Sequence, residues 1–548
     1  MLTLPALAPT TAVHLPRNEP VLDYAPGSPE RAALRAALAR ARGEEIEMPL
    51  VIGGRAVRTG RLETAVMPHD HAHVLGHAHL ASTREVEAAI AAAKAAAPAW
   101  SRQPWRERAA VFLRAAHLLA GPWRYTLNAA TMLGQSKTAH QAEIDSAAEL
   151  IDFWRFNVAF MQRIHEEQPL SPPGARNTAD YRPLEGFILA LTPFNFTAIA
   201  GNLPSAPALM GNTVVWKPSA AAKYAAHFVM EILRKAGLPD GVINLVYGDP
   251  EDVTRVALAD PDFAGLHFTG STAVFNALLS RIGQDIGRYR TYPRVVGETG
   301  GKNFIMAHAS AETDALATAV IRGGYEYQGQ KCSAASRVFV PASLWPRLQA
   351  RLCDEIATID VGDVCDFRNF MGAVIDERAW RRHRQVIDEA GFVAHAKTLY
   401  HRPLDGERGY FIGPTLIETS DLHSRFMTEE FFGPIVTAFV YPDNEFDSCL
   451  AAIDAGGRYA LTGTIFASDK DAILAATQRL RHTAGNFYIN DKPTGAVVGQ
   501  QPFGGGRASG TNDKAGSLWN LMRWTSPRTV KETFAPPTDY RYPFMAES

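Results

Sequence analysis

The chain has few cysteines for its length: Cys332, Cys353, Cys365 and Cys449 are the only four in 548 residues. None of them form a C-x-x-C pair, so zinc ribbons and thioredoxin-type redox motifs find no support. So few thiols in so long a chain are typical of a reducing compartment. We therefore expect a cytoplasmic protein, with the mitochondrial matrix as the alternative.

An excess of charge of either sign is also missing. The chain carries 55 Lys and Arg residues against 57 Asp and Glu residues, for a formal net charge of −2. This balance gives no global attraction to polyanions, so neither nucleic acid nor a membrane surface is an expected partner. The 46% of hydrophobic and 20% of charged residues are typical of a globular chain, and the length suggests about two to four domains.

Long apolar runs are absent. The longest, residues 186–215, is interrupted by prolines and asparagines, so no transmembrane helix of about 20 apolar residues is predicted. The first 16 residues, MLTLPALAPTTAVHLP, lack the charged start and apolar core of a secretory signal. They also lack several arginines at amphipathic spacing, so they support a mitochondrial presequence only weakly.

Strand-like and helix-like segments alternate along the chain. Helices are predicted at 28–42, after Ser82 with Glu85 completing a capping box, and as a long amphipathic helix at 139–160. The polar stretch 165–183 predicts a loop or an exposed hairpin. Short apolar runs predict strands at 186–191, 213–216, 242–246, 265–268 and 294–296.

Helical segments, most clearly 221–236, lie between these strands, and a second set of strands and helices fills 303–480. The alternation predicts an α/β fold whose parallel sheets are covered by helices. No fixed-period repeat and no low-complexity linker separates the parts.

Two segments are candidates for phosphate binding. GETGGKNF at 297–304 fails as a P-loop, because Val296 replaces the required glycine and Asn303 replaces Ser or Thr. The turn Thr269–Thr272 follows a predicted strand and leads into a helix-like segment. Its free N–H groups suit a pyrophosphate, although an ordinary helix cap is the more frequent origin of such a turn.

A histidine-rich tract spans His69, His71, His73, His77 and His79. Alternation would place the first three on one face of a strand, where metal binding is conceivable. No cysteine or carboxylate cluster completes such a site nearby, apart from Asp70 on the opposite face. A solvated strand is the favoured interpretation, and we predict no metal.

Cys332 stands among small and polar neighbours in GQKCSAAS, residues 329–336. A free cysteine is most often a small core residue, but this context leaves room for a substrate, and Lys331 would favour the thiolate. No histidine lies in the segment to act as a base. Glu298, between Gly297 and Gly300, is the obvious acidic candidate.

Six segments in order resemble the aldehyde dehydrogenase superfamily, and the similarity runs from about Asn18 to the C-terminus. They are TPFNFTAIAGNLPSAPALMGNTVVWKPS (192–219), FTGST (268–272), GETGGK (297–302), GQKCSA (329–334), EEFFGP (429–434) and QPFGGGRASGTNDK (501–514). Within the superfamily, the segments 142–157, 486–505 and 523–533 resemble the branch that oxidises glutamate γ-semialdehyde.

This resemblance implies an aldehyde dehydrogenase-like α/β fold in three parts. A Rossmann-like NAD-binding domain would comprise 1–165 and 185–298, and an α/β catalytic domain 299–507. A β-flap of 166–184 with the C-terminal segment 522–548 would make a homodimer or a higher homo-oligomer.

The resemblance also implies the chemistry. Cys332 would attack the aldehyde to give a thiohemiacetal, with the Asn195 side chain and the Cys332 N–H as oxyanion donors. Losing one such donor typically costs about 10²–10³ in rate. Hydride transfer to NAD would leave a thioester, which Glu298 would hydrolyse as general base. The substrate would be glutamate semialdehyde and the product glutamate, in the second step of proline catabolism.

The remaining site residues follow from the same resemblance. The cofactor would contact Thr192, Lys217, Gly270, Ser271, Glu430 and Phe432. The α-carboxylate of the substrate would meet the Ser333 hydroxyl and the N–H groups of Gly495 and Ala496. Other predicted substrate residues are Phe196 and Phe503 around the aliphatic chain, Glu149 near the α-amino group, and Lys331. Plain core packing stays an alternative for the two phenylalanines.

Four alternatives stay open from the sequence. Ala220 stands where many superfamily members carry an acidic residue, so NAD rather than NADP depends on the branch resemblance alone. The substrate could be another small semialdehyde, such as succinate semialdehyde. A thiol-dependent acyl hydrolase would use Cys332 and Glu298 without a dinucleotide, and a non-enzymatic relative would need neither.

Overall fold

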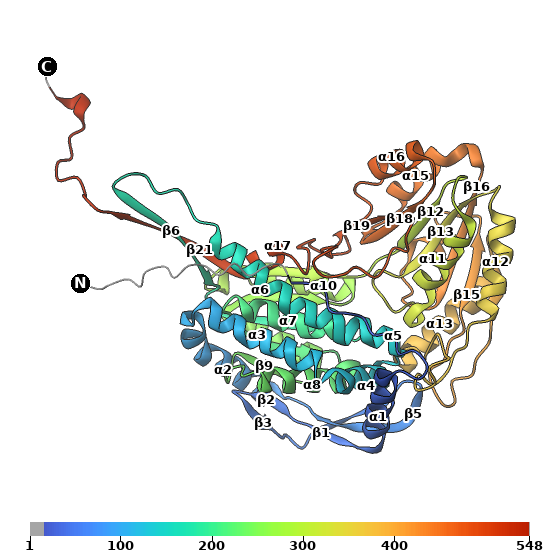
Figure 1. The fold of residues 1–548 in the computed structure, drawn as a ribbon, viewed down its shortest axis with the longest axis horizontal. Helices are drawn as coiled ribbons and strands as arrows, with labels where there is room; N and C mark the ends of the chain where they lie inside the picture. The colour runs from blue at the N-terminus through green and yellow to red at the C-terminus, as the bar shows by residue number, and fades with distance from the viewer. Residues whose placement is uncertain (1–15, 547–548) are drawn as a thin grey trace.

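The structure, a computed structural model, describes residues 16–546 (Figure 1). The predictions about a targeting signal concern residues that lie almost wholly outside this range, as does the very end of the predicted C-terminal segment. No helix within 16–546 is long and apolar enough to cross a membrane.

The first of two large sheets contains all five strands predicted between 186 and 296. Their apolar sequences explain this, because strands of a parallel sheet are buried on both faces; every residue of β7 and β8 is buried. Two short antiparallel strands extend the sheet at one edge. The strand order is β11 (Arg294–Glu298), β10 (Phe263–Thr269), β7 (Phe187–Thr192), β8 (Thr213–Pro218), β9 (Ile243–Leu245), β2 (Leu50–Ile52) and β3 (Arg55–Val57).

Helices cover this first sheet, and four of the eight, α1, α2, α9 and α10, begin with a local side-chain cap. Ser82 and Glu85 form the predicted capping box of α2, and Ser28 accepts a hydrogen bond from the Arg31 N–H at the start of α1. The helices of this part are α1 (Pro29–Gly43), α2 (Thr83–Arg102), α3 (Trp105–Ala120), α4 (Arg124–Gln135), α7 (Thr197–Leu209), α8 (Lys223–Lys235), α9 (Pro250–Ala259) and α10 (Thr272–Gln284).

The predicted helix at 139–160 is wrong in two details. It is interrupted by a π-helical segment, Glu143–Glu149, between α5 (Ala139–Ala142) and α6 (Leu150–Glu166). Its acidic residues do not form a solvated face: Glu143 and Asp145 are fully buried. A π-helical turn inserts an extra residue, which rotates the following side chains relative to a regular helix and is frequent at functional sites.

The second large sheet carries the other half of the chain. Six of its seven strands run parallel, and the edge strand β14 is antiparallel to β15. Its order is β14 (Ala396–His401), β15 (Thr415–Thr419), β16 (Ile435–Tyr441), β13 (Ala335–Pro341), β12 (Asn303–Ala307), β18 (Thr462–Phe466) and β19 (Asn486–Ile489). The covering helices include α11 (Thr313–Tyr325), α12 (Trp345–Ala357), α13 (Glu377–Ala390), α15 (Phe446–Gly456) and α16 (Lys470–Arg479).

A two-stranded ribbon projects from the body of the molecule (Figure 1). It pairs β6 (Ala175–Pro183) with β21 (Thr525–Thr533) in antiparallel register over nine residue pairs, after the short helix α17 (Leu518–Met522). The sequence predicted a loop or hairpin here, but the partner strand comes from the distant C-terminal segment. A smaller sheet of β1 (Ile46–Met48), β5 (Asp70–His79) and β4 (Leu62–Met67) lies beside the first large sheet.

Candidate active site

A strained turn delivers Cys332 to the junction between the two large sheets. Tyr327 and Gln328 both have left-handed backbones, with φ of 51° and 56°. Such strain persists only when the surroundings hold it. Here the Gln328 side chain donates to the Ala373 carbonyl (2.7 Å) and accepts from the Gly372 N–H (3.0 Å). The next position requires glycine, because a Cβ on Gly329 would lie 2.2 Å from the Gly433 carbonyl oxygen.

Two asparagines then fix the backbone around the cysteine. Asn303 Nδ2 donates to the Cys332 carbonyl (2.7 Å), and Asn195 Nδ2 donates to the Gln330 carbonyl (3.0 Å). Asn195 lies just before α7 and Asn303 begins β12, so these bonds join the cysteine loop to both sheets. The Cys332 thiol is free and half-buried. The second N–H of the Asn195 amide and the Cys332 N–H are the donors that an oxyanion would need.

The environment of Cys332 does not favour the thiolate, contrary to the expectation from Lys331. Burial raises the pKa of the Cys332 thiol far above its usual range, and the charges of Glu298 and Glu430 raise it further. The Lys331 ammonium is paired with Glu326 at 3.0 Å, so its charge is neutralised locally. The thiol is therefore protonated at neutral pH, and its attack on a carbonyl requires a proton acceptor.

Glu298 is suited to accept that proton. It is the last residue of β11, and burial raises its pKa well above the usual value for a carboxyl. Its Oε2 atom is buried and has no hydrogen-bond partner in the described part of the chain. The charge of Lys514, whose ammonium donates to the carbonyls of Gly485 and Gly504, opposes this shift. A buried carboxylate with a free oxygen is the environment of a general base.

Glu430 and Phe432 lie on the other side of the cysteine. Glu430 Oε1 accepts a hydrogen bond from the Gly301 N–H (2.8 Å), and burial raises its pKa to about 7. Gly300 permits this approach, since a Cβ there would lie 2.0 Å from Glu430 Oε2. Phe432 has a left-handed backbone (φ 57°), and its ring packs edge-on against Phe194. Held strain of this kind concentrates at ligand sites.

The predicted dinucleotide residues gather at the carboxyl ends of the first sheet. Thr192 ends β7 and accepts a hydrogen bond from the Trp216 indole (3.0 Å), and Lys217 lies beside it on β8. Ser271 caps α10, and the Gly270 N–H donates to the Glu298 carbonyl. Ligands of open α/β sheets bind at this edge.

The residues present at this edge fit an anionic, hydroxyl-rich dinucleotide. The Lys217 ammonium is buried and forms no hydrogen bond among the described residues, and burial lowers its pKa to about 8. An unpartnered buried ammonium is costly unless a ligand supplies an acceptor. The capped N-terminus of α10, 13 residues long, adds backbone N–H groups and the positive end of the helix dipole.

The predicted substrate residues are only partly brought together. Ser333 is buried, and its hydroxyl is 2.7 Å from that of Thr494, directly before Gly495 and Ala496. Gly495 has φ 93°, a conformation that turns successive N–H groups toward one concavity. Phe503 is half-buried, and its backbone pairs with Ala515.

Phe196 and Glu149 are two further predicted substrate residues, and they differ in their surroundings. Phe196 is half-buried and lies under the Lys137 ammonium, 4.0 Å from the ring centroid. Burial raises the pKa of Glu149 to about 8, and its charge is felt by Cys332. No contact joins Phe196 to Phe503 among the described residues, so the predicted sandwich around the substrate stays a prediction.

Sequence reasoning missed the support beneath Asn195. Asp145 accepts hydrogen bonds from the N–H groups of Thr197 (3.0 Å) and Ala198 (2.8 Å), and so caps α7 from a distant helix. Lys137 Nζ lies 2.7 Å from Asp145 Oδ2, and both side chains are almost fully buried. The sequence offered one indication of this contact. The N-cap residue of α7 is Phe196, whose side chain has no oxygen, so the helix needs a cap from elsewhere.

The interpretation of the histidine tract as a solvated strand is wrong for two of its members. His79 is buried and pairs with Glu47 at 2.8 Å. His69 is fully buried, and it lies in the turn before β5, not on the strand face shared with His71 and His73. Those two histidines donate from Nε2 to the backbone carbonyls of Gly406 and Arg42 respectively.

Comparison with known proteins agrees with this geometry. The aldehyde dehydrogenase family profile matches residues 58–530. The chain is 49% identical to a Delta-1-pyrroline-5-carboxylate dehydrogenase of Agaricus bisporus, over 96% of each chain. It is 47% identical to the mitochondrial enzyme of that name from Bos taurus, over 96% of this chain and 94% of the other.

Solved structures give the same result. The Delta-pyrroline-5-carboxylate dehydrogenase of Mycobacterium tuberculosis bound with NAD superposes with a TM-score of 0.95 at 55% identity, covering 98% of this chain and 99% of the other. The Thermus 1-pyrroline-5-carboxylate dehydrogenase with bound NAD superposes with a TM-score of 0.88 at 31% identity, covering 95% and 100%.

The buried pair of Lys137 and Asp145 gives a testable prediction. Asp145→Ala should lower the free energy of unfolding by about 3–5 kcal/mol, because it leaves the Lys137 ammonium buried without a partner and α7 without a cap. Chemical denaturation measures this. Asp539→Ala, which breaks an exposed ion pair with Arg541, is the matched control and should change stability by less than about 0.5 kcal/mol. Equal effects of the two changes would contradict the assignment.

Proposed function

Because the chain belongs to the aldehyde dehydrogenase family, we propose that it is the NAD-dependent enzyme that oxidises L-glutamate γ-semialdehyde to L-glutamate. The semialdehyde is in equilibrium with Δ1-pyrroline-5-carboxylate, and the reaction is the second step of proline catabolism. One observation carries the proposal: a free thiol, Cys332, lies where the edge of the dinucleotide sheet meets Glu298, a buried carboxylate with one unpaired oxygen.

The first step is attack of Cys332 Sγ on the aldehyde carbon. Its raised pKa means that the thiol proton leaves as the bond forms, and the unpaired Oε2 of Glu298 can receive it. The carbonyl oxygen becomes an oxyanion, which accepts hydrogen bonds from the Asn195 amide and the Cys332 N–H. Both donors are held in place before the substrate binds. The Asn195 amide is fixed by its bond to the Gln330 carbonyl, and the Cys332 backbone is fixed by the bond from Asn303.

The cofactor would be held by the residues at the carboxyl edge of the first sheet and by those beside the cysteine. Lys217 and Thr192 would hold the adenosine side, Gly270 and Ser271 the pyrophosphate, and Glu430 and Phe432 the nicotinamide side. When bound, NAD⁺ accepts the hydride that leaves the tetrahedral adduct. Glu430 keeps Oε2 available for a ribose hydroxyl, because only its Oε1 is used by Gly301.

Glu298 acts again in the release of the product. The thioester carbon is attacked by water, and a carboxylate must take a proton from that water. The unpaired Oε2 of Glu298, in a buried setting with a raised pKa, provides the acceptor. Because the base acts only when ionised, its active fraction falls as the pH is lowered through the raised pKa.

The groups proposed to select the substrate surround Ser333. The Ser333 hydroxyl and the N–H groups of Gly495 and Ala496 would bind the α-carboxylate, and Glu149 would bind the α-amino group. Phe196 and Phe503 would contact the aliphatic chain. Lys331, predicted as a substrate residue, supports Glu326 through its ion pair and adds positive charge near Glu149.

The three-part division proposed from the sequence accords with the position of the sheets. The dinucleotide would bind to 1–165 and 185–298, and the catalytic residues would lie mainly in 299–507. The ribbon of 166–184 and 522–548 would make a homodimer or larger homo-oligomer, because its strands project with exposed apolar side chains at Val530 and Phe534. The four unpaired cysteines support a reducing compartment, for which we propose the cytoplasm.

Removing the thiol tests the nucleophile. Cys332→Ala should lower kcat by at least about a thousandfold, because no covalent adduct can form. The dissociation constant for NAD⁺, measured by fluorescence titration, should stay within about twofold of the wild type. An NADH-forming rate within tenfold of the wild type would remove Cys332 from this role. Cys353→Ala, a cysteine on α12, is the matched control and should keep full activity.

Replacing the base tests its part in hydrolysis. Glu298→Gln should still form NADH close to one per site, more slowly than the wild type because the acceptor of the thiol proton is lost. The steady state that follows should be slowed further, by about 10²–10⁴-fold, because the thioester accumulates. The wild-type steady-state rate should rise with pH as Glu298 ionises, and this rise should vanish in the variant. Stopped-flow absorbance across a pH series measures both. A variant with an unchanged steady state and pH profile would assign the base elsewhere.

Removing the Ser333 hydroxyl tests substrate selection. Ser333→Ala should raise KM for glutamate semialdehyde by about tenfold or more, because a hydrogen bond to a charged group is lost, and should leave KM for propanal nearly unchanged. Steady-state kinetics with both aldehydes decides. Equal changes for both would refute carboxylate binding by Ser333. Ser343→Ala, an exposed serine outside the site, is the control.

A further inference from the structure

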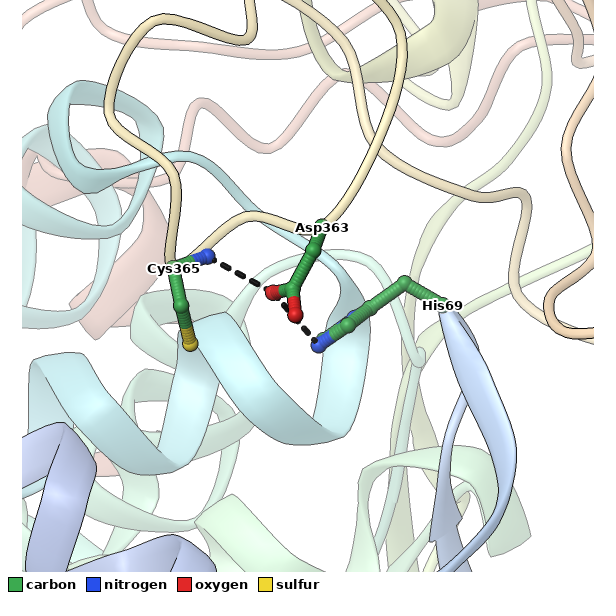
Figure 2. A group of neighbouring side chains, drawn as sticks. All are labelled: His69, Asp363 and Cys365. Carbon is green, nitrogen blue, oxygen red and sulfur yellow. Dashed lines mark hydrogen bonds and ion pairs between the residues drawn. The ribbon is translucent and has the colours of Figure 1, made fainter.

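Three side chains that could bind a metal meet outside the group of residues assigned to catalysis (Figure 2). His69 comes from the turn between β4 and β5, and Asp363 and Cys365 come from the loop after α12. One potential ligand atom from each lies within 4.8 Å of the other two. His69 Nε2 is 3.5 Å from Asp363 Oδ1, which also accepts a hydrogen bond from the Cys365 N–H (2.9 Å).

His69 supplies independent evidence that this cluster is built for a ligand. Its ring is fully buried, yet Nε2 has no hydrogen-bond partner within residues 16–546, and Figure 2 shows it directed at the Asp363 carboxylate. A buried polar atom without a partner is costly. Nδ1 lies 3.2 Å from Ser136 Oγ, and when Nδ1–H donates there Nε2 keeps its lone pair.

We propose that His69 Nε2, an Asp363 carboxylate oxygen and Cys365 Sγ bind a divalent transition-metal ion, for which Zn²⁺ is the best fit. One imidazole, one carboxylate and one thiolate are ligands that Zn²⁺ prefers, and water would complete a tetrahedron. Asp363 and Cys365 are only partly buried, which leaves the ion an entry path. On binding, the Cys365 S–H bond breaks heterolytically: sulfur keeps the electron pair and the proton goes to solvent.

The surrounding charges leave room for a cation. Arg42 pairs with Asp363 Oδ2 (3.2 Å) and also contacts the Cys365 side chain, and Arg408 lies 3.9 Å from Asp363 Oδ2, the oxygen turned away from His69. Asp70 lies between them, 3.9 Å from Arg42 and 3.2 Å from Arg408. With Cys365 ionised, three negative side chains offset two positive ones, so the charge that faces an arriving ion is net negative.

The proposed metal site is connected through hydrogen bonds to the turn that precedes Cys332. Ser136, which contacts His69, accepts the Ala373 N–H at its hydroxyl and the Gln328 Nε2–H at its carbonyl. Gln328 belongs to the left-handed turn that precedes Cys332. Occupancy would therefore stabilise the contact between the small sheet, α4 and the catalytic loop. Binding should raise the thermal midpoint as the logarithm of metal concentration over its dissociation constant.

Cobalt binding tests the site in the full-length protein. We would use the Cys332→Ala chain, so that the catalytic thiol cannot bind the ion, after EDTA dialysis. Titration with Co²⁺ should give one ion per chain, a thiolate-to-cobalt charge-transfer band, and displacement of that band by Zn²⁺. His69→Gln and Cys365→Ser should each weaken binding by at least about 100-fold. Cys353→Ser is the matched cysteine control and should leave the band unchanged.

The cobalt titration and the thermal measurements either support the metal site or contradict it. A Cys332→Ala chain without a thiolate–cobalt band, or a band that survives both His69→Gln and Cys365→Ser, would overturn the site. Should either variant fold poorly, as judged by circular dichroism, Asp363→Asn at the partly exposed ligand takes its place with the same expected loss. A rise in the thermal midpoint with Zn²⁺ in Cys332→Ala, absent from Asp363→Asn, supports the site; equal rises in both contradict it.

Discussion

The hydrogen bond from Asn303 to the Cys332 carbonyl is the contact on which the catalytic geometry depends. The same amide nitrogen also donates to the Ala334 carbonyl (2.9 Å), and its oxygen accepts the Thr462 N–H of β18 (3.0 Å). One side chain thus ties the cysteine loop to two neighbouring strands of the second sheet. A Cβ on Gly301 would lie 2.6 Å from the Cys332 oxygen, so the approach requires glycine there. A rigid scaffold of this kind sets the direction of the thiol before any substrate arrives.

Desolvation governs the chemistry of the same region. Glu149, Glu298 and Glu430 are separate carboxyl groups whose pKa values are all raised by burial, and the charges of all three raise the pKa of the Cys332 thiol. The positive charges within reach are used elsewhere, Lys331 by Glu326 and Lys137 by Asp145. Without substrate or cofactor, the Cys332 thiol therefore keeps its proton and is not a thiolate. Loss of a proton from any member lowers the tendency of its neighbours to ionise, which couples the steps of the reaction.

Local signals in the sequence predicted much of the fold. The strands around 186–296 are continuous apolar runs, so they were predicted at nearly their observed bounds, and the capping box predicted the start of the helix after Ser82. The ordered segments around Asn195, Glu298 and Cys332 identified the family, which the profile match and the relatives confirm. The roles given to individual site residues stay predictions.

Contacts between segments far apart in the chain could not be predicted from the sequence. Asp145 caps α7 across 52 positions of sequence, and β6 finds its partner more than 340 residues away, so neither pairing leaves a local pattern. His69 meets Asp363 and Cys365 only because the β4–β5 turn folds against a loop of the second half. The amphipathic pattern of 139–160 predicted a helix but not the burial of Glu143 and Asp145, because helical periodicity alone cannot distinguish a polar surface from a buried polar network.

The central claim is that a thioester forms on Cys332 and is released by Glu298. Mass spectrometry of peptides from the Glu298→Gln chain, quenched in acid after mixing with NAD⁺ and glutamate semialdehyde, tests this most directly. The account predicts a glutamyl adduct on the peptide that contains Cys332, formed only when both NAD⁺ and the aldehyde are present. An adduct on another cysteine, or one that forms equally without NAD⁺, would contradict it.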